Sequence, residues 1–327
     1  MNFPNSYFKI KPVYFLIILL TLLSFQTISQ YTILPEIDKR INIQDSILSG
    51  DMEPPYQYRL VKPILGYSLQ YLILAMGADK IQAHELSYRI LIFFVFLGIY
   101  SLFYSYLKNF FADNICMLGL VMLHVVIPLG ITSIWEEGDY YTLLIYLIGF
   151  NLMFKKKDYY LPVLIAVGIF NRDQVIFLLA FYIIYLYSEG RLFERKSLLI
   201  IFSSVVLSLF TYLLPRFIFG FKESKYTIHH NTTSNLDLWK QIVELWIAEI
   251  LIFIILCLRA FKKSITFFKI SFICLGIYVI IFFFNGILTQ LAKFLPAYLI
   301  LIPMSLQLFK IEFTKKNYNQ GLPAIKT

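Results

Sequence analysis

The stretch GIFNRDQVIFLLAFY (168–182) places Arg172 and Asp173 between two apolar runs. Charged side chains inside a membrane segment are costly unless they face a polar cavity and find partners there. The whole chain is apolar, because 59% of its 327 residues are hydrophobic and only 15% are charged, with a mean hydropathy of +0.70. Soluble domains are about one quarter charged. The composition therefore predicts an all-α polytopic transmembrane helix bundle, and the motif predicts a polar pocket within it.

Eight apolar runs have about the length needed to cross a bilayer, which is roughly 20 residues for a helix. They lie near residues 13–31, 86–106, 114–134, 139–154, 197–219, 241–258, 265–284 and 286–309. We find no internal repeat and no soluble domain, so residues 1–327 are expected to form a single transmembrane domain with about eight full spans.

The apolar pieces on either side of the opening motif, 159–170 and 175–187, are each too short to cross a bilayer. Basic residues favour the cytoplasmic side of a membrane. The basic groups at 155–157 and 191–196 share one side only if residues 159–187 form a short-helix hairpin. This topology puts Asn171, Arg172 and Asp173 at the outer tip of the hairpin. It also predicts an inner (plasma) membrane protein with both termini in the cytoplasm.

Two segments are then expected outside the membrane, a first extracytoplasmic loop at 32–85 and a second at 219–240. The first loop contains an apolar segment at 63–77 that is too short to cross. Leu65, Leu69, Leu72, Ile73 and Met76 of this segment share one helical face, which predicts a helix lying in the membrane interface.

Charged residues near the predicted outer surface leave several interpretations open. Glu136, Glu137 and Asp139 in SIWEEGDYY (133–141) could hold a divalent cation, which prefers oxygen ligands. They could also orient Arg172, or simply cap a span in solvent. Arg172 itself could bind an anionic headgroup through two parallel hydrogen bonds, or form a structural ion pair with Asp173. Lys293 could reach the membrane surface or contact a phosphate.

The formal net charge of +9 does not predict nucleic-acid binding. The Lys and Arg residues concentrate in short links between apolar runs, where they encode membrane topology. No basic face with interleaved aromatic residues is present. The expected partner is therefore the lipid bilayer.

Three stretches together resemble the glycosyltransferase-C superfamily, particularly its small bacterial members without a soluble domain. The first is PPYQYRLVKPIL (54–65), which is similar to the segment leading into an interfacial helix. The second is residues 136–179, with the order of acid, span, basic link, short helix and Asn-Arg-acid. The third is LAKFLPAYLILIP (291–303), a basic-aromatic-proline pattern in the last span.

The resemblance implies transfer of a sugar from a lipid-linked donor, such as a polyprenyl-phosphate sugar, to a glycan, lipid or protein acceptor. It also implies that an aspartate of the first outer loop is the general base, for which Asp45, Asp38 and Asp51 are the candidates. The candidate phosphate-binding residues are Arg59, Arg172, Lys293, Asn171 and Tyr58. The candidates for acidic support, or for holding a divalent cation, are Glu137, Asp139 and Asp173.

Three other functions fit the same pattern: a transporter or lipid flippase, a polysaccharide polymerase, and a non-catalytic partner in an envelope assembly complex. Transporters commonly place broken helices and buried charges near the bilayer midplane, within repeated halves. This chain shows no repeat, and its polar residues cluster toward one side. The pattern therefore favours an enzyme at the membrane surface.

Overall fold

A computed structural model describes residues 11–129, 133–224 and 226–319 of the chain. Within these ranges the protein is helical, without β-strands, which confirms the all-α prediction. The helices are α1 (Pro12–Ile28), α2 (Ile37–Ser49), α3 (Val61–Ala75), α4 (Lys80–Leu107), α5 (Asp113–Leu129), α6 (Gly138–Phe154), α7 (Leu161–Ile169), α8 (Phe177–Ser188), α9 (Arg195–Phe219), α10 (Ile228–Asp237), α11 (Trp239–Glu249), α12 (Leu251–Ala260), α13 (Thr266–Asn285) and α14 (Tyr298–Asn319).

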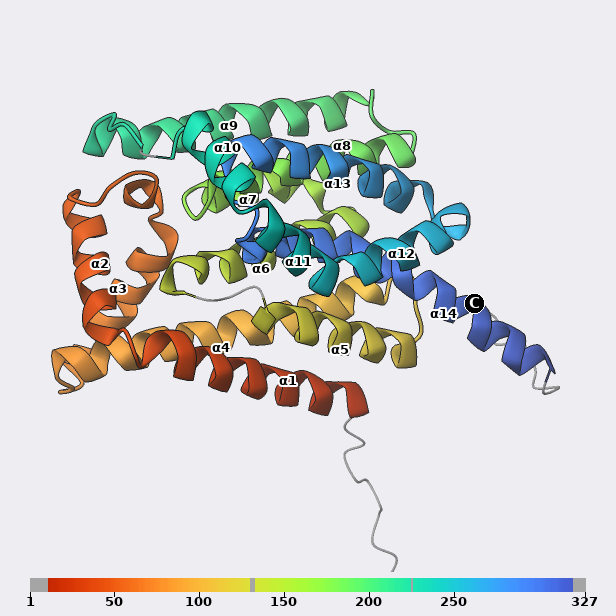
Figure 1. The fold of residues 1–327 in the computed structure, drawn as a ribbon, viewed down its shortest axis with the longest axis horizontal. Helices are drawn as coiled ribbons and strands as arrows, with labels where there is room; N and C mark the ends of the chain where they lie inside the picture. Colours follow the sequence, from red (N-terminus) through yellow and green to blue (C-terminus); the bar gives the residue numbers. More distant parts are fainter. Residues whose placement is uncertain (1–10, 130–132, 225, 320–327) are drawn as a thin grey trace, which may run out of the picture.

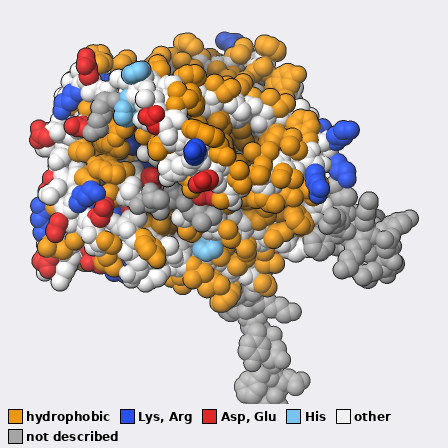
Figure 2. Space-filling model, viewed as in Figure 1, with side chains coloured by type: hydrophobic (Ala, Val, Ile, Leu, Met, Phe, Trp, Pro, Cys, Tyr) orange, Lys and Arg blue, Asp and Glu red, His pale blue; other side chains and the backbone are white. Residues whose placement is uncertain are grey.

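Among the described residues, five helical segments are long and apolar enough to cross a membrane, which makes this a multi-pass membrane protein. They are Pro12–Ile33, Lys80–Leu107, Arg195–Phe219, Thr266–Asn285 and Leu291–Phe309. α11 and α12 together would make a sixth, but they meet at a bend of 54°. Figure 2 shows hydrophobic side chains over most of the middle of one face, with charged side chains gathered mainly toward its two ends.

Two of the expected spans, 114–134 and 139–154, form helices α5 and α6 of 17 residues each. A helix of that length extends about 26 Å, which is slightly less than the roughly 30 Å of a hydrocarbon core. α6 is the central helix of the bundle, packed against α4, α7 and α8. Tyr140, Tyr146 and Phe150 on α6 are completely buried. The position of α6 matters because Asp139, near its start, contacts the motif at the hairpin tip.

The chain turns back on itself at the opening motif, as the sequence predicts, and Arg172 lies at the turn between α7 and α8. The ends of the two arms away from the tip meet, because Arg191 after α8 pairs with Asp158 before α7 at 3.5 Å. At the tip, the Leu60 backbone N–H donates to the Phe170 carbonyl at 2.7 Å. The hairpin tip is therefore attached to the segment that leads into α3.

Helices α2 and α3 form a compact cap at one end of the bundle (Figure 1). Within the outer loop expected at 32–85, a helix is predicted only at 63–77, but α2 also forms there and buries Arg40, Ile41, Gln44 and Ile47 along one face. It ends at Gly50, whose φ of 91° is rare for residues with a side chain. The periodicity of α2 is easily missed because two of its four buried side chains are polar.

The predicted interfacial segment 63–77 forms helix α3. Leu65, Leu72 and Met76 are exposed, as a helix in the membrane interface requires, whereas Ile73 is buried against the protein. The second expected outer segment, 219–240, also contains a helix, α10. Asn235 of α10 donates to the Phe283 carbonyl at 2.8 Å and so attaches this segment to the end of α13.

Different helix ends and links gather at the two ends of the bundle. Helices α1, α9 and α13 all begin at the end of the molecule opposite the α2–α3 cap (Figure 1). The basic link after α6, residues 155–157, lies between α6 and α7, so it is at that same end. The hairpin tip, the end of α9 and the end of α13 lie toward the cap. Polar and charged side chains from these three places meet in the candidate site.

A cationic cavity beneath the helical cap

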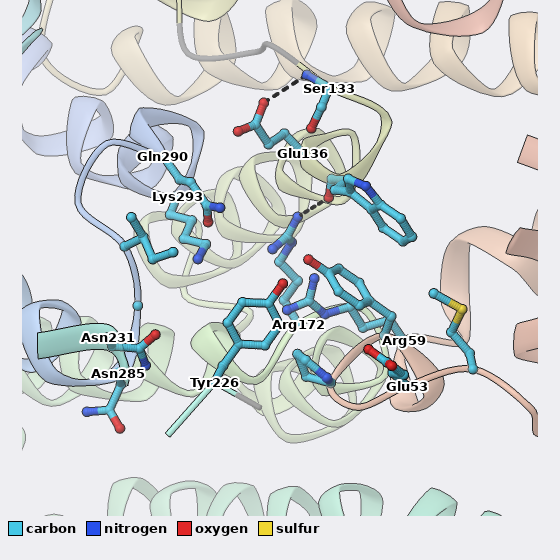
Figure 3. Close-up of a pocket in the computed structure, with 16 residues that line it drawn as sticks. Glu53, Arg59, Ser133, Glu136, Arg172, Tyr226, Asn231, Asn285, Gln290 and Lys293 are labelled. Carbon is cyan, nitrogen blue, oxygen red and sulfur yellow. Dashed lines mark hydrogen bonds between the residues drawn. The ribbon is translucent and has the colours of Figure 1, made fainter. Parts of the chain in front are cut away.

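Two adjoining cavities lie between the cap and the ends of the long helices. The first has a volume of about 380 Å³ and is lined by residues that include Glu53, Arg59, Glu136, Arg172 and Lys293 (Figure 3). The second has a volume of about 660 Å³. Arg59, Arg172 and Lys293 line both, so we refer to them as the shared cations. All three are residues that the sequence analysis assigns to phosphate binding.

The shared cations come from three distant parts of the chain. Arg59 precedes α3, Arg172 is the hairpin tip, and Lys293 is near the start of the candidate span Leu291–Phe309. In Figure 3 their charged ends face one common space. Like charges that approach one another under low solvent exposure repel, and burial together with Arg172 lowers the pKa of Arg59 to about 10. Arg59 nevertheless remains protonated at neutral pH.

Arg172 is held in place by α6 and the turn before it. Its guanidinium pairs with Asp139 at 2.9 Å and donates to the Trp135 carbonyl at 2.7 Å. Gln174 donates to the other oxygen of Asp139 at 3.2 Å. Asp139 therefore orients Arg172, whereas no hydrogen bond or ion pair joins Arg172 to its neighbour Asp173 among the described residues. The alternative of an Arg172–Asp173 pair across the tip is wrong.

Arg172 also depends on a glycine. A Cβ atom added at Gly138, the first residue of α6, would lie 3.1 Å from the Arg172 Nε atom. The guanidinium thus lies flat against the helix start because the side chain there is only a hydrogen atom. Any larger residue must push Arg172 toward the cavity or away from Asp139.

We expect Gly138→Ala to weaken anion binding about tenfold, or about 1.4 kcal/mol, while leaving the fold intact because Ala is the better helix former. The measurement is a titration of the protein in nanodiscs with decyl phosphate, in which tryptophan fluorescence reports binding because Trp135 lines the cavity. Gly276→Ala is the matched control, because its added Cβ meets nothing within 4 Å. Equal affinities of the two variants would contradict this role of Gly138.

Arg59 and Lys293 carry charges that nearby protein groups do not neutralise. Within the described ranges, neither side chain forms a hydrogen bond or an ion pair with a carboxylate. The Arg59 guanidinium lies over the Tyr56 ring, 4.9 Å from its centroid. A cation held out of water without a counter-charge is unfavourable. These two side chains therefore favour an anionic ligand in the space between them.

The second cavity contains further charged groups that the first lacks. It is lined by Arg216 and Lys222 in addition to the shared cations, and by Asp173. Arg216 approaches Asp173 at 3.9 Å and lies over the Tyr58 ring, 4.3 Å from its centroid. The Tyr58 hydroxyl donates to the Gly220 carbonyl at 2.8 Å. Tyr58 thus supports Arg216 and fixes the end of α9.

The three acids of SIWEEGDYY point in different directions. Asp139 holds Arg172, whereas Glu136 lines the first cavity and its side chain accepts the Ser133 backbone N–H at 3.1 Å. Glu137 is completely buried, away from the cavity. Among the described residues no group of three His, Cys, Asp or Glu side chains could hold a metal ion. The acids therefore do not form a shared cation site.

Glu137 is the centre of a buried charge cluster that attaches the cap to the bundle. It accepts hydrogen bonds from Arg40 of α2 at 2.7 Å, Lys62 of α3 at 3.0 Å and Thr32 at 2.6 Å. Burial opposes its charged form, but Arg40 and Lys62 outweigh burial and hold the pKa of Glu137 below its usual range. Glu137 therefore does not orient Arg172, and its role is structural.

Asn171 has a structural position as well. Its side-chain amide donates to the Gly138 carbonyl at 2.8 Å and to the Thr142 hydroxyl at 2.9 Å. Both partners belong to α6. Asn171 is buried and lines neither of the two large cavities. It fixes the hairpin tip against α6 and so positions the adjacent Arg172.

The three aspartates expected to act as general base lie elsewhere. Asp38 and Asp45 are exposed on α2, and Asp45 pairs with Lys80 at 3.2 Å. Asp51 is exposed after α2 and accepts a hydrogen bond from Ser49 at 2.7 Å. None of the three lines either cavity. They do not share a chamber with Arg172, because α2 turns Asp38 and Asp45 outward and Asp51 is exposed just after that helix ends.

Glu53 is the carboxylate of the first outer segment that does line the cavity. No motif in the sequence marks Glu53 as a site residue. Its place next to the Pro54–Pro55 pair could have indicated a fixed position, since such pairs fix the course of a loop. Arg216 is missed for a different reason. It lies within the long apolar run 197–219, and no motif in the sequence marks it.

Comparison with known proteins does not assign the cavity to a family. The chain matches no protein-family model, no curated protein and no solved structure.

Proposed function

We propose that this protein is a membrane glycosyltransferase that moves a sugar from a polyprenyl-linked phosphate donor to an extracytoplasmic acceptor. One observation carries the proposal: the shared cations converge with Glu53 and Glu136 in a cavity at the ends of apolar helices. Cations stabilise a departing phosphate, and a carboxylate accepts the proton of the attacking hydroxyl. Both requirements of sugar transfer from a lipid phosphate are present in one chamber.

The proposal includes the full topology expected from the sequence. In it, α5, α6 and the α11–α12 pair also cross the bilayer, giving about eight spans of glycosyltransferase-C type, and α3 lies in the interface. The cap and the cavity face the outside, and both termini are cytoplasmic in the inner membrane. The positive-inside rule supports this orientation, since the basic link 155–157 lies at the end opposite the cap.

Each charged group has a separate task in this reaction. Arg59, Arg172 and Lys293 bind the donor phosphate, whose negative charge grows as the bond to the sugar breaks. Glu53 takes the proton from the acceptor hydroxyl. Glu136 is the weaker base candidate, because its side chain already accepts the Ser133 backbone N–H at 3.1 Å. No metal ion is needed for these tasks.

A transporter would use the same charges differently. Transporter sites commonly lie near the bilayer midplane, whereas here Arg216, Asn285 and Lys293 lie near the ends of their candidate spans. This position favours chemistry at the membrane surface over passage through the membrane.

The test uses purified protein in proteoliposomes that contain polyprenyl-phosphate hexoses and pentoses, with a hydroxyl acceptor outside. We expect free polyprenyl phosphate to appear, as measured by mass spectrometry of the lipid extract. In parallel, a fluorescent lipid phosphate reports movement between leaflets. Lipid movement without release of polyprenyl phosphate would replace the proposed transferase with a flippase.

Lys293 gives a further prediction. We expect Lys293→Met to weaken binding of a polyprenyl phosphate by about 1.5–3 kcal/mol, the usual contribution of a hydrogen bond to a charged group. Isothermal titration in nanodiscs measures this loss. Lys269→Met on α13, a lysine that does not line either cavity, is the control. Wild-type affinity in the Lys293 variant would remove this lysine from the phosphate site.

A further inference from the structure

The second cavity holds more positive charge than the first. Five cationic side chains line it, and Asp173 is its one carboxylate among the described residues. Arg172 is compensated by Asp139, and Arg216 in part by Asp173. Arg59, Lys222 and Lys293 have no carboxylate within ion-pair distance in the described part of the chain. Three cationic side chains therefore face this cavity without a carboxylate partner, and the Lys222 ammonium donates to the Gly50 carbonyl at 2.5 Å.

This excess is informative because donor lipids differ in charge. A sugar joined to a lipid through a single phosphate is a phosphodiester with one negative charge, and a sugar joined through a diphosphate carries two. Uncompensated charges in a chamber of low dielectric are stabilised by a ligand of matching opposite charge. One phosphate leaves most of the cationic excess unmatched.

Arg216 is prepared to receive a second phosphate. Its guanidinium stacks on Tyr212 at 3.5 Å and lies over Tyr58 at 4.3 Å, both measured to the ring centroids. One of its nitrogens donates to the Tyr212 carbonyl. Its contact with Asp173 is long, at 3.9 Å. A stacked guanidinium loses little further freedom when its remaining N–H groups bind a phosphate in parallel pairs.

A wholly apolar groove lies beside Arg59 and Arg216. It has a volume of about 390 Å³ and is lined by residues from the start of α3, from α7 and from α9. Leu60 and Pro215 in its wall are the sequence neighbours of Arg59 and Arg216. A lipid chain in this groove would join its headgroup next to Arg216. The sugar would then lie toward the shared cations and Glu53.

We propose that the donor headgroup is a diphosphate, with the sugar-linked phosphate between Arg59 and Lys293 and the lipid-linked phosphate on Arg216 and Lys222. This inference rests on the proposed function and narrows its substrate class. Arg216 is then the residue that distinguishes a diphosphate from a monophosphate. Transfer cleaves the bond between sugar and phosphate, and the lipid diphosphate leaves with the bonding electron pair.

The test compares binding of geranylgeranyl diphosphate and geranylgeranyl monophosphate to the full chain in nanodiscs of neutral lipid. We expect the diphosphate to bind at least about tenfold more tightly to the wild type. Arg216→Met should reduce this ratio to about one, chiefly by weakening the diphosphate. Arg216→Lys, which keeps the charge but loses the paired donors, should give an intermediate ratio.

Arg195→Met is the matched control, since Arg195 is an exposed arginine at the opposite end of the same helix. It should leave the ratio unchanged, and thermal unfolding should show that all variants remain folded. Equal affinities for the two lipids in the wild type, or an unchanged ratio in both Arg216 variants, would overturn the diphosphate assignment and leave the transferase proposal standing. Failure of both lipids to bind would overturn the diphosphate assignment and the transferase proposal together.

Discussion

Glu53→Gln should reduce sugar transfer by about 10²–10⁴-fold, the usual contribution of a general base, with little change in donor binding. Gln keeps the shape of the side chain but cannot accept the acceptor's proton. Glu53 lines the cavity that also contains Arg59, Arg172 and Lys293, so its loss affects the proton and leaves the phosphate contacts in place. The measurement is the initial rate of release of the free polyprenyl phosphate or diphosphate in proteoliposomes, together with donor affinity.

Asp51→Asn is the matched control for Glu53→Gln, because Asp51 belongs to the same segment and is exposed outside the cavity. Asp45→Asn and Asp38→Asn complete the comparison. We expect all three aspartate variants to retain transfer within about threefold of wild type, as surface substitutions usually change little. A large loss in an aspartate variant combined with a normal rate in Glu53→Gln would return the role of base to that aspartate.

Glu137→Gln should destabilise the folded protein by about 3–5 kcal/mol, the cost of breaking a buried ion pair from one side. The side chains of Arg40 and Glu137 are 1% and 0% exposed, and Lys62 is 18% exposed. The substitution leaves two cations without their counter-charge. Because the folded-state pKa of Glu137 is lowered, its stabilisation is complete at neutral pH and is lost only as the pH falls through that lowered value.

Equilibrium unfolding in mixed micelles with increasing dodecyl sulfate measures this loss. Asp45→Asn is the control, since the Asp45–Lys80 pair has a similar separation of 3.2 Å but side chains that are 52% and 60% exposed. Exposed pairs contribute at most about 1 kcal/mol. Similar losses in the two variants would contradict the assignment of Glu137 as the main link between cap and bundle.

The long apolar helices and the hairpin follow from the sequence with little ambiguity. Burial of about 20 consecutive apolar residues has few alternatives to a membrane helix. The distribution of basic residues required residues 159–187 to turn back, and the Arg191–Asp158 pair shows that the arms do so. Arg59, Arg172 and Lys293 were grouped as candidate phosphate-binding residues on the family resemblance, and the structure places them around shared cavities.

The fate of each acid required the tertiary structure. Glu136, Glu137 and Asp139 are neighbours in sequence, but a helix start sends successive side chains about 100° apart. One therefore lines the cavity, one holds the cap and one holds Arg172. Asp45 and Glu53 likewise belong to one segment, yet α2 turns Asp45 toward solvent, while Glu53, after the helix ends, reaches the cavity.

The sequence by itself determined that the chain is a multi-pass helical protein and that its cations must meet in a polar place, since apolar length and the cost of buried charge are local properties. Only the tertiary structure decided which carboxylate accompanies those cations and that Arg216 joins them. These choices depend on helix rotation and on contacts between residues far apart in the chain, such as Tyr58 with Arg216. Neither is encoded in the pattern of any single segment.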